Sequence, residues 1–200
     1  NILDMIAFTP LKNVPVYQGS AGPISGIPPL LDSAYGSNGL SNAVLPSSPS
    51  TVEDKPASEW LADTLKKSED PITIICTGPL TDIAKAIDLC PSIADQNHEV
   101  LWLGGALLPS GLDHKPVRLK SGEYKIGNIT HFAEFNAIND PVAAQIVADS
   151  SMKLTIMPLD VTQHLTVDHC SVTQFLRGMA GKEQLAITLV SMLDDAAIMD

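Results

Sequence analysis

Short apolar runs alternate with amphipathic stretches through the middle of the chain. Three runs, at residues 72–76, 100–103 and 154–157, are rich in aliphatic and β-branched side chains, and each ends at a Gly or Pro signal. Runs of this length and composition predict strands. The run at 72–76 is almost uniformly apolar, which favours a strand buried on both faces.

Amphipathic stretches lie between these runs. Apolar side chains recur at helical spacing in residues 57–67, where Trp60 is expected in the core, and in residues 80–87. Asp140 has the chemistry of a helix N-cap and Pro141 suits the first helical position, so a further helix is expected to begin there. The side chains expected on its buried face are Val142, Ile146 and Val147.

The two ends of the chain carry weaker patterns. Residues 14–17 predict a short strand, residues 19–56 are rich in Gly, Pro and Ser and predict a long loop, and residues 182–199 predict a last amphipathic helix. The chain opens on an amphipathic stretch that is typical of a helix interior. We therefore expect the sequence to be a fragment of a longer protein.

Strands that alternate with helices predict an α/β fold with a mainly parallel central sheet flanked by helices, Rossmann-like in the loose sense. The three apolar runs are expected to be parallel neighbours in that sheet. No Gly-x-Gly-x-x-Gly follows the first strand, so a dinucleotide site is not indicated. Ligands of such sheets bind beyond the carboxyl ends of the strands. Thr77, Gly104, Gly105 and Asp160 all follow strands and are therefore expected to share one site.

Composition limits the possible partners. The formal net charge of -11 argues against nucleic acid or an anionic membrane, because both bind basic surfaces. The three cysteines form no CxxC motif, which favours reduced thiols in a cytoplasmic protein. No apolar run approaches the length of a membrane span. An uncharged small molecule fits this composition.

The segment 127–141 holds the most informative chemistry. Asn128, Glu134 and Asn136 have the spacing Asn-x5-Glu-x-Asn just before a helix. Amides and a carboxylate that converge on one pocket suit a polyhydroxylated ligand, because each hydroxyl both donates and accepts. The alternative is that Asn128 completes a Gly-Asn turn and Glu134 is a solvated charge. Asp140 is interpreted as a structural cap rather than a ligand.

Three strings taken in order, at 76–84, 127–141 and 158–162, resemble the nucleoside hydrolase family of the inosine-uridine-preferring type. The resemblance covers nearly the whole chain, so residues 1–200 would form one incomplete nucleoside hydrolase domain. It implies an enzyme that hydrolyses the N-glycosidic bond of ribonucleosides, works as a homo-oligomer (dimer or tetramer) and uses calcium. The alternative is a truncated, non-catalytic member that binds a nucleoside or a partner without turnover.

The resemblance also assigns roles to individual residues. The backbone oxygen of Thr77 would bind calcium, where the alternative is a plain strand-to-helix turn. Asn128 and Glu134 would meet the 5'-hydroxyl of the ribose, and Asn136 its 2',3' side. Leu103 would be an apolar pocket contact. Tyr35 stands where the family usually has histidine, which leaves the base preference open.

The resemblance leaves the catalytic centre incomplete. The family's general base lies in an aspartate-rich N-terminal motif that these residues do not contain, so the base is expected outside this chain. Asp194 and Asp195 are interpreted as helix surface and not as the expected His-Asp element. No histidine is assigned a role, although His131 could face the pocket. Residues 107–126 form a longer connection than the family usually has and could act as a lid.

Overall fold

The computed structural model describes residues 2–7, 13–29, 40, 45, 47–107, 117–118, 124–162, 164, 174 and 178. The chain divides into two compact units. The first comprises residues 1–16, 31–53 and 166–200; its described helix is α1 (Ile2–Ile6), whose Asp4 accepts a hydrogen bond from the Ser48 N–H at 2.7 Å. The second comprises residues 17–30 and 54–165 and contains every other described helix and strand.

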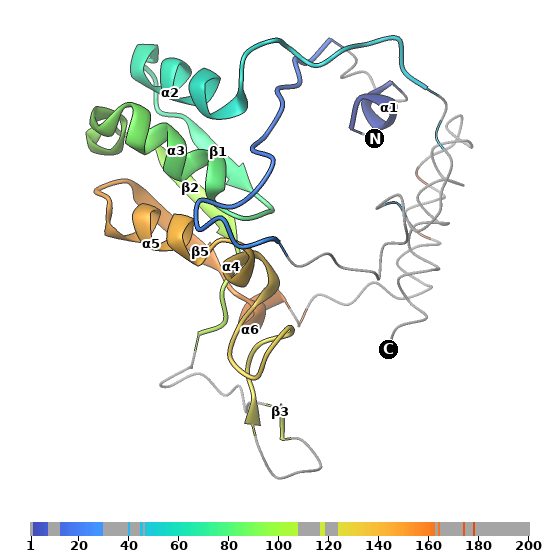
Figure 1. Cartoon of the computed structure of the whole chain (residues 1–200), viewed down its shortest axis with the longest axis vertical. Coiled ribbons are helices and arrows are strands. Elements are labelled where there is room, and N and C mark those ends of the chain that lie inside the picture. Colours follow the sequence, from blue (N-terminus) through green and yellow to red (C-terminus); the bar gives the residue numbers. More distant parts are fainter. Residues whose placement is uncertain are drawn as a thin grey trace. The chain divides into compact units, whose positions relative to one another are not determined.

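A parallel three-stranded sheet forms the centre of the second unit (Figure 1). Its strands are β1 (Thr73–Cys76), β2 (Glu99–Leu103) and β5 (Lys153–Met157), in the order β1-β2-β5. Both pairs are parallel, so the three carboxyl ends meet at one edge. The predicted parallel neighbours and the predicted α/β class are confirmed.

Helices cover one face of this sheet. The helices α2 (Ala57–Lys67), α3 (Thr81–Leu89) and α5 (Pro141–Asp149) lie in a row along it in Figure 1. The 3-10 helix η2 (Pro91–Asp95) follows α3 and packs against α3 and α2. The strand side chains that face these helices lie in register. The two rows are Ile74, Val100 and Leu154, then Cys76, Trp102 and Ile156. Burial of this apolar surface is the main stabilising contribution.

Shorter elements follow the central strands. The strands β3 (Val117–Arg118) and β4 (Tyr124–Lys125) pair antiparallel within the segment 107–126. Helix α4 (Phe135–Asn139) precedes α5, and α6 (Leu159–Thr162) follows β5 directly. Among the described residues, no helix is both long and apolar enough to cross a membrane.

The prediction that the first strand is buried on both faces is wrong. Exposure alternates along β1, and the Ile75 side chain is 74% exposed. Within the described sheet β1 lies at the edge, and the helices pack against the face that carries Ile74 and Cys76. An apolar run therefore shows that a strand belongs to a core, but it does not show how many faces are covered.

Three finer predictions also need correction. Val142 is 40% exposed, because α5 buries Ala143 and Val147 one turn apart, and Val142 precedes that face. Trp60 is half-buried and stacks on Tyr17, with ring centroids 4.5 Å apart. The expected strand at 14–17 is reduced to a single bridged residue at its end. The predicted last helix, 182–199, lies outside the described residues.

Candidate active site

Hydrogen bonds connect the turns that follow the three central strands. The Gly104 N–H donates to the Met157 carbonyl at 3.2 Å, and the Leu159 N–H donates to the Gly105 carbonyl at 2.9 Å. On the other side of β2, the indole N–H of Trp102 donates to the Gly78 carbonyl at 3.1 Å. The turns after β1, β2 and β5 therefore form one continuous edge, as the parallel topology requires.

Asn136 connects two of these strand ends. It lies on α4 and is only 8% exposed. Its side-chain amide donates to the Leu103 carbonyl at 2.8 Å and to the Thr77 carbonyl at 3.3 Å. Both hydrogens of the amide group thus point to backbone oxygens. Asn136, which is predicted to bind the sugar, therefore hydrogen-bonds to the Thr77 carbonyl, which is predicted to bind the metal.

Glu134 is held by backbone N–H groups. It caps α4, with Oε1 accepting from the Asn136 N–H at 3.0 Å and Oε2 from the Ala137 N–H at 3.1 Å. Oε2 also accepts from the Gly105 N–H at 2.8 Å. Its side chain is 7% exposed, so the interpretation as a solvated surface charge is wrong. A carboxylate held in this way is fixed in position and orientation.

Gly105 has a role that its place in the sequence did not reveal. Its φ of 78° lies in the left-handed region, which an L side chain rarely adopts. This conformation belongs to the turn in which the Gly105 N–H reaches Glu134. The Gly-Gly pair after an apolar run indicated only the end of a strand, because a backbone donor has no signature in the sequence.

Asn128 belongs to a tight loop that returns to the start of α4. Its Oδ1 accepts from the Phe135 N–H at 3.0 Å, and its side chain is exposed. A side chain at Gly127 would come within 2.2 Å of the Ala133 carbonyl oxygen, so the close approach of the two arms requires glycine. Asn128 therefore has the loop role of the Gly-Asn turn alternative, and its contact with a ribose stays a prediction.

The remaining predicted site residues differ in how far they are buried. The Thr77 side chain is exposed, and Leu103 is 38% exposed at the end of β2. Asp160 is 9% exposed and accepts from the Leu107 N–H at 2.7 Å, which fixes the start of the connection 107–126. Tyr35 lies outside the described residues.

Burial raises the pKa of the Cys76 thiol next to Thr77, so this cysteine stays protonated at neutral pH.

The described residues around Thr77 provide only part of the ligand set that a metal ion needs. A main-chain carbonyl such as that of Thr77 suits a hard cation, and it has two lone pairs of which Asn136 uses one. The described part of the chain contains no group of three or more His, Cys, Asp or Glu side chains able to hold a metal. Thr77 fits as one ligand of such an ion and not as a site by itself.

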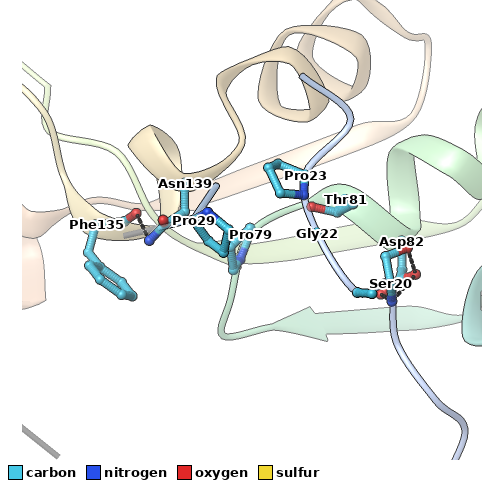
Figure 2. A pocket seen from close by; sticks show the side chains of 10 residues that line it. Ser20, Gly22, Pro23, Pro29, Pro79, Thr81, Asp82, Phe135 and Asn139 are labelled. Atoms are coloured by element: carbon cyan, nitrogen blue, oxygen red, sulfur yellow. Dashed lines mark hydrogen bonds between the residues drawn. The ribbon is translucent and has the colours of Figure 1, made fainter. Parts of the chain in front are cut away.

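A cavity of about 290 Å³ lies beside this region, between the segment after Ser20, the start of α3 and helix α4 (Figure 2). Its lining residues are Ser20, Ala21, Gly22, Pro23, Pro29, Pro79, Thr81, Asp82, Phe135 and Asn139. None of the predicted substrate-binding residues is among them. The candidate site is therefore the hydrogen-bonded region around Asn136, and the cavity lies next to it.

His98 has a structural role that the sequence did not indicate. It is 3% exposed; Nδ1 accepts from the Ile72 N–H at 3.1 Å and Nε2 lies 3.0 Å from the Leu65 carbonyl. These partners belong to the amino end of the sheet and the end of α2. Among histidines, His114 and His169 lie outside the described residues.

Comparison with known proteins points to one family. The family model of the inosine-uridine preferring nucleoside hydrolases matches residues 1–198. The chain is 35% identical over 150 residues to pyrimidine-specific ribonucleoside hydrolase RihB of Escherichia coli, covering 75% of this chain and 42% of RihB. It is 30% identical over 179 residues to RihA of Escherichia coli, covering 90% of this chain and 52% of RihA. The purine-preferring ribonucleoside hydrolase of Gardnerella vaginalis superposes with a TM-score of 0.79 at 26% identity, covering 98% of this chain and 57% of that chain.

The chain therefore belongs to the inosine-uridine preferring nucleoside hydrolase family. The relatives named above are ribonucleoside hydrolases, a class of glycosidases, and the family is generally metal-dependent. The chain spans about half the length of the RihA and RihB proteins that it matches. The resemblance expected from the three sequence strings is confirmed.

Proposed function

We propose that the complete protein hydrolyses the N-glycosidic bond of ribonucleosides and releases the free base and ribose. One observation carries this proposal. The Asn136 amide bonds to the carbonyls of Thr77 and Leu103, while Glu134, two residues earlier, is fixed on the Gly105 N–H of the same edge. The candidate sugar-binding groups and the candidate metal-binding carbonyl thus lie within one small region at the carboxyl ends of parallel strands.

The hydrogen bonds already made determine what each group can offer a ligand. Asn136 donates both amide hydrogens to the protein, which leaves its Oδ1 as an acceptor. Asn128 uses its Oδ1 as an acceptor, which leaves its amide as a donor. Glu134 accepts three backbone bonds, and a carboxylate has about four acceptor positions. One donor beside two acceptors suits a sugar whose hydroxyls both donate and accept.

The charge of Glu134 suits the reaction as well as the binding. Cleavage of a glycosidic bond passes through an oxocarbenium-like state in which positive charge develops on the sugar ring. A fixed carboxylate near the ring stabilises that charge without reorganisation. We infer that Asn128 and Glu134 meet the 5'-hydroxyl and that Asn136 meets the 2',3' side. The general base is an aspartate outside these residues.

We propose calcium as the metal, with the Thr77 carbonyl as one ligand, because this cation takes neutral and anionic oxygen ligands together. When bound, the ion supplies a water molecule of lowered pKa. The residues of this chain hold and orient the sugar. We further propose that residues 1–200 are part of a single domain, that the protein is cytoplasmic, and that it forms a homo-oligomer (dimer or tetramer).

Base preference depends on other parts of the site. The relatives named above are called pyrimidine-specific in two cases and purine-preferring in the third, so family membership permits either class. Leu103, partly exposed at the strand end, is proposed as an apolar contact for the nucleoside. Tyr35 is proposed as a base contact from the segment outside the described residues.

The direct test uses the complete gene product purified without metal. Release of ribose from inosine, uridine and cytidine is measured with and without added calcium. We expect hydrolysis of at least one nucleoside, loss of activity in a chelator and recovery with calcium. Nucleoside binding by calorimetry without any ribose release would replace this proposal with the non-catalytic alternative.

A further inference from the structure

A buried carboxylate lies next to the proposed sugar-binding site. Asp140 is 0% exposed and joins α4 to α5. Its Oδ1 accepts from the Ala143 N–H at 3.0 Å, which is the predicted N-cap bond. Its Oδ2 accepts from the Thr81 hydroxyl at 2.6 Å and from the Ile24 N–H at 2.9 Å. Capping α5 explains only the first of these bonds.

The bond between Asp140 and Thr81 repeats, four residues later on both segments, the bond between Asn136 and Thr77. Asn136 lies in α4 and Asp140 directly follows its last residue, while Thr77 and Thr81 bound the turn from β1 into α3. We call the Asn136–Thr77 bond the inner rung and the Asp140–Thr81 bond the outer rung. Two rungs between the same two segments fix both their separation and their register.

The outer rung is the stronger of the two. It is a hydroxyl-to-carboxylate bond of 2.6 Å between two buried side chains, whereas the Asn136 amide meets the Thr77 carbonyl at 3.3 Å. Bonds to an ionised acceptor are shorter and roughly twice as strong as neutral ones. The outer rung is therefore the one better able to set the distance between the two segments.

The energetics of burial favour a positional role for Asp140. Burying a carboxylate is costly unless hydrogen bonds compensate it, and an apolar pair of similar volume would often hold two helices equally well. A short polar bond differs from apolar packing because it fixes a distance and a direction. The feature that needs such a fixed distance is the inner rung, where one amide must reach two carbonyls.

We propose that Asp140 and Thr81 are positioning residues of the nucleoside site, and that the outer rung holds the Thr77 carbonyl in register with the Asn136 amide. The geometric part of this inference concerns the described residues only. Its consequence for catalysis rests on the proposed function. Neither residue is proposed to contact the nucleoside or the metal.

The experiment compares four variants of the complete protein. Thr81→Val removes the hydroxyl at nearly constant volume, and Thr81→Ser keeps the hydroxyl. Ser150→Ala is the matched control, since the Ser150 hydroxyl bonds to the Val147 carbonyl at 2.7 Å at the opposite end of α5. Asp140→Asn tests the partner, and Thr81→Val remains informative if that variant fails to fold.

The first measurement is the NMR signal of the Asn136 side-chain amide in protein labelled with ¹⁵N-asparagine. In Thr81→Val we expect the Asn136 amide proton that bonds to the Thr77 carbonyl to move toward the shift of an amide in water, and in Thr81→Ser and Ser150→Ala to stay in place. Wild-type shifts in Thr81→Val, whether or not its melting temperature falls, would overturn the proposal.

The second measurement is steady-state kinetics on the same variants. We expect kcat/KM of Thr81→Val to fall about tenfold, because small displacements of positioned groups reduce catalysis strongly, with rescue by Thr81→Ser. Unchanged kinetics in Thr81→Val beside an altered Asn136 signal would also overturn the catalytic part. If the wild-type protein hydrolyses no nucleoside, the proposed function fails, while the NMR measurement still decides whether the outer rung positions the inner one.

Discussion

The two ends of the central sheet both contain buried polar side chains, but they use them differently. At the amino end, His98 directs both ring nitrogens to the protein, where the Ile72 N–H requires Nδ1 to be an acceptor and Nε2 therefore to carry the hydrogen. At the carboxyl end, Asn136 and Glu134 are similarly buried. After their bonds to the backbone, the Asn136 Oδ1 and one position on the Glu134 carboxylate can still accept a hydrogen bond.

This difference separates a structural site from a candidate functional one. Burial alone does not distinguish them, because all three side chains are less than a tenth exposed. What distinguishes them is the number of hydrogen-bonding positions that remain after the backbone is satisfied. We therefore expect substitutions at the carboxyl end to change catalysis and substitutions at the amino end to change stability.

The largest effect is expected from Glu134→Ala and Asn136→Ala in the complete protein. Each removes a fixed group beside the sugar and should lower kcat/KM by roughly ten- to a hundredfold, which corresponds to about 1.5 to 3 kcal/mol. Steady-state kinetics on inosine and uridine measure this. Gln145→Ala, on the exposed side of α5, is the control and should match the wild type. Near-wild-type kinetics for both alanine variants would remove the basis for the sugar-binding assignment.

The opposite pattern is expected from His98→Ala. Removal of the ring leaves the Ile72 N–H without its partner inside the protein and takes one of its donors from the Leu65 carbonyl, which still accepts from the Ser68 N–H at 3.3 Å. The free energy of unfolding should fall by about 2 kcal/mol. Urea denaturation measures this loss, and kcat/KM below the transition should stay unchanged. His98→Asn, which keeps an acceptor near Nδ1, should recover part of the stability. A stable but inactive His98→Ala protein would contradict the division between the two ends.

A smaller effect is expected at His131, in the loop between Asn128 and Glu134. We expect His131→Ala to change the ratio of inosine to uridine hydrolysis, or to leave both rates within about threefold of the wild type. The residue is exposed and lies in the loop, not in the strand-end edge that holds Asn136. Measuring both substrates side by side tests this, and loss of all activity would show that a necessary group had been overlooked.

The smallest effect is expected at Glu99, on the surface of β2. The Lys153 ammonium at 2.9 Å holds the pKa of Glu99 below its ordinary value of 4.5. A lowered carboxyl pKa adds stability above the unfolded pKa, and that stability is lost as the pH falls through the folded pKa. Glu99→Gln should therefore lower the melting temperature at pH 7 by no more than about 2 °C and leave it unchanged at pH 3. A larger drop at pH 3 than at pH 7 would contradict this sign.

Local sequence patterns determined the elements of the fold. The strands β1, β2 and β5 follow the three apolar runs within one residue, and α5 begins at Pro141 with Asp140 as its cap. Strand and cap signals depend on neighbouring residues, so they can be recognised without knowledge of the fold. The parallel order follows as well, because strands separated by helices must cross over.

The candidate site was only partly visible in the sequence. The spacing of Asn128, Glu134 and Asn136 marked a polar segment, and their family resemblance suggested a sugar. The sequence could not show that Glu134 takes a bond from the Gly105 N–H, since a backbone donor is common to nearly every residue. It also gave no sign of His98, whose partners are 26 and 33 residues away.

The sequence by itself thus determined the class of fold, the start of α5 and the identity of the polar groups at the strand ends. Only the tertiary structure decided which sheet face the helices cover and which groups the buried carboxylates of Glu134 and Asp140 accept hydrogen bonds from. The physical reason is that periodicity and capping act within a few residues. The satisfaction of a buried polar group depends on partners brought together by folding, such as Asp140 with Thr81 and Asn136 with Thr77, 59 residues apart in both cases.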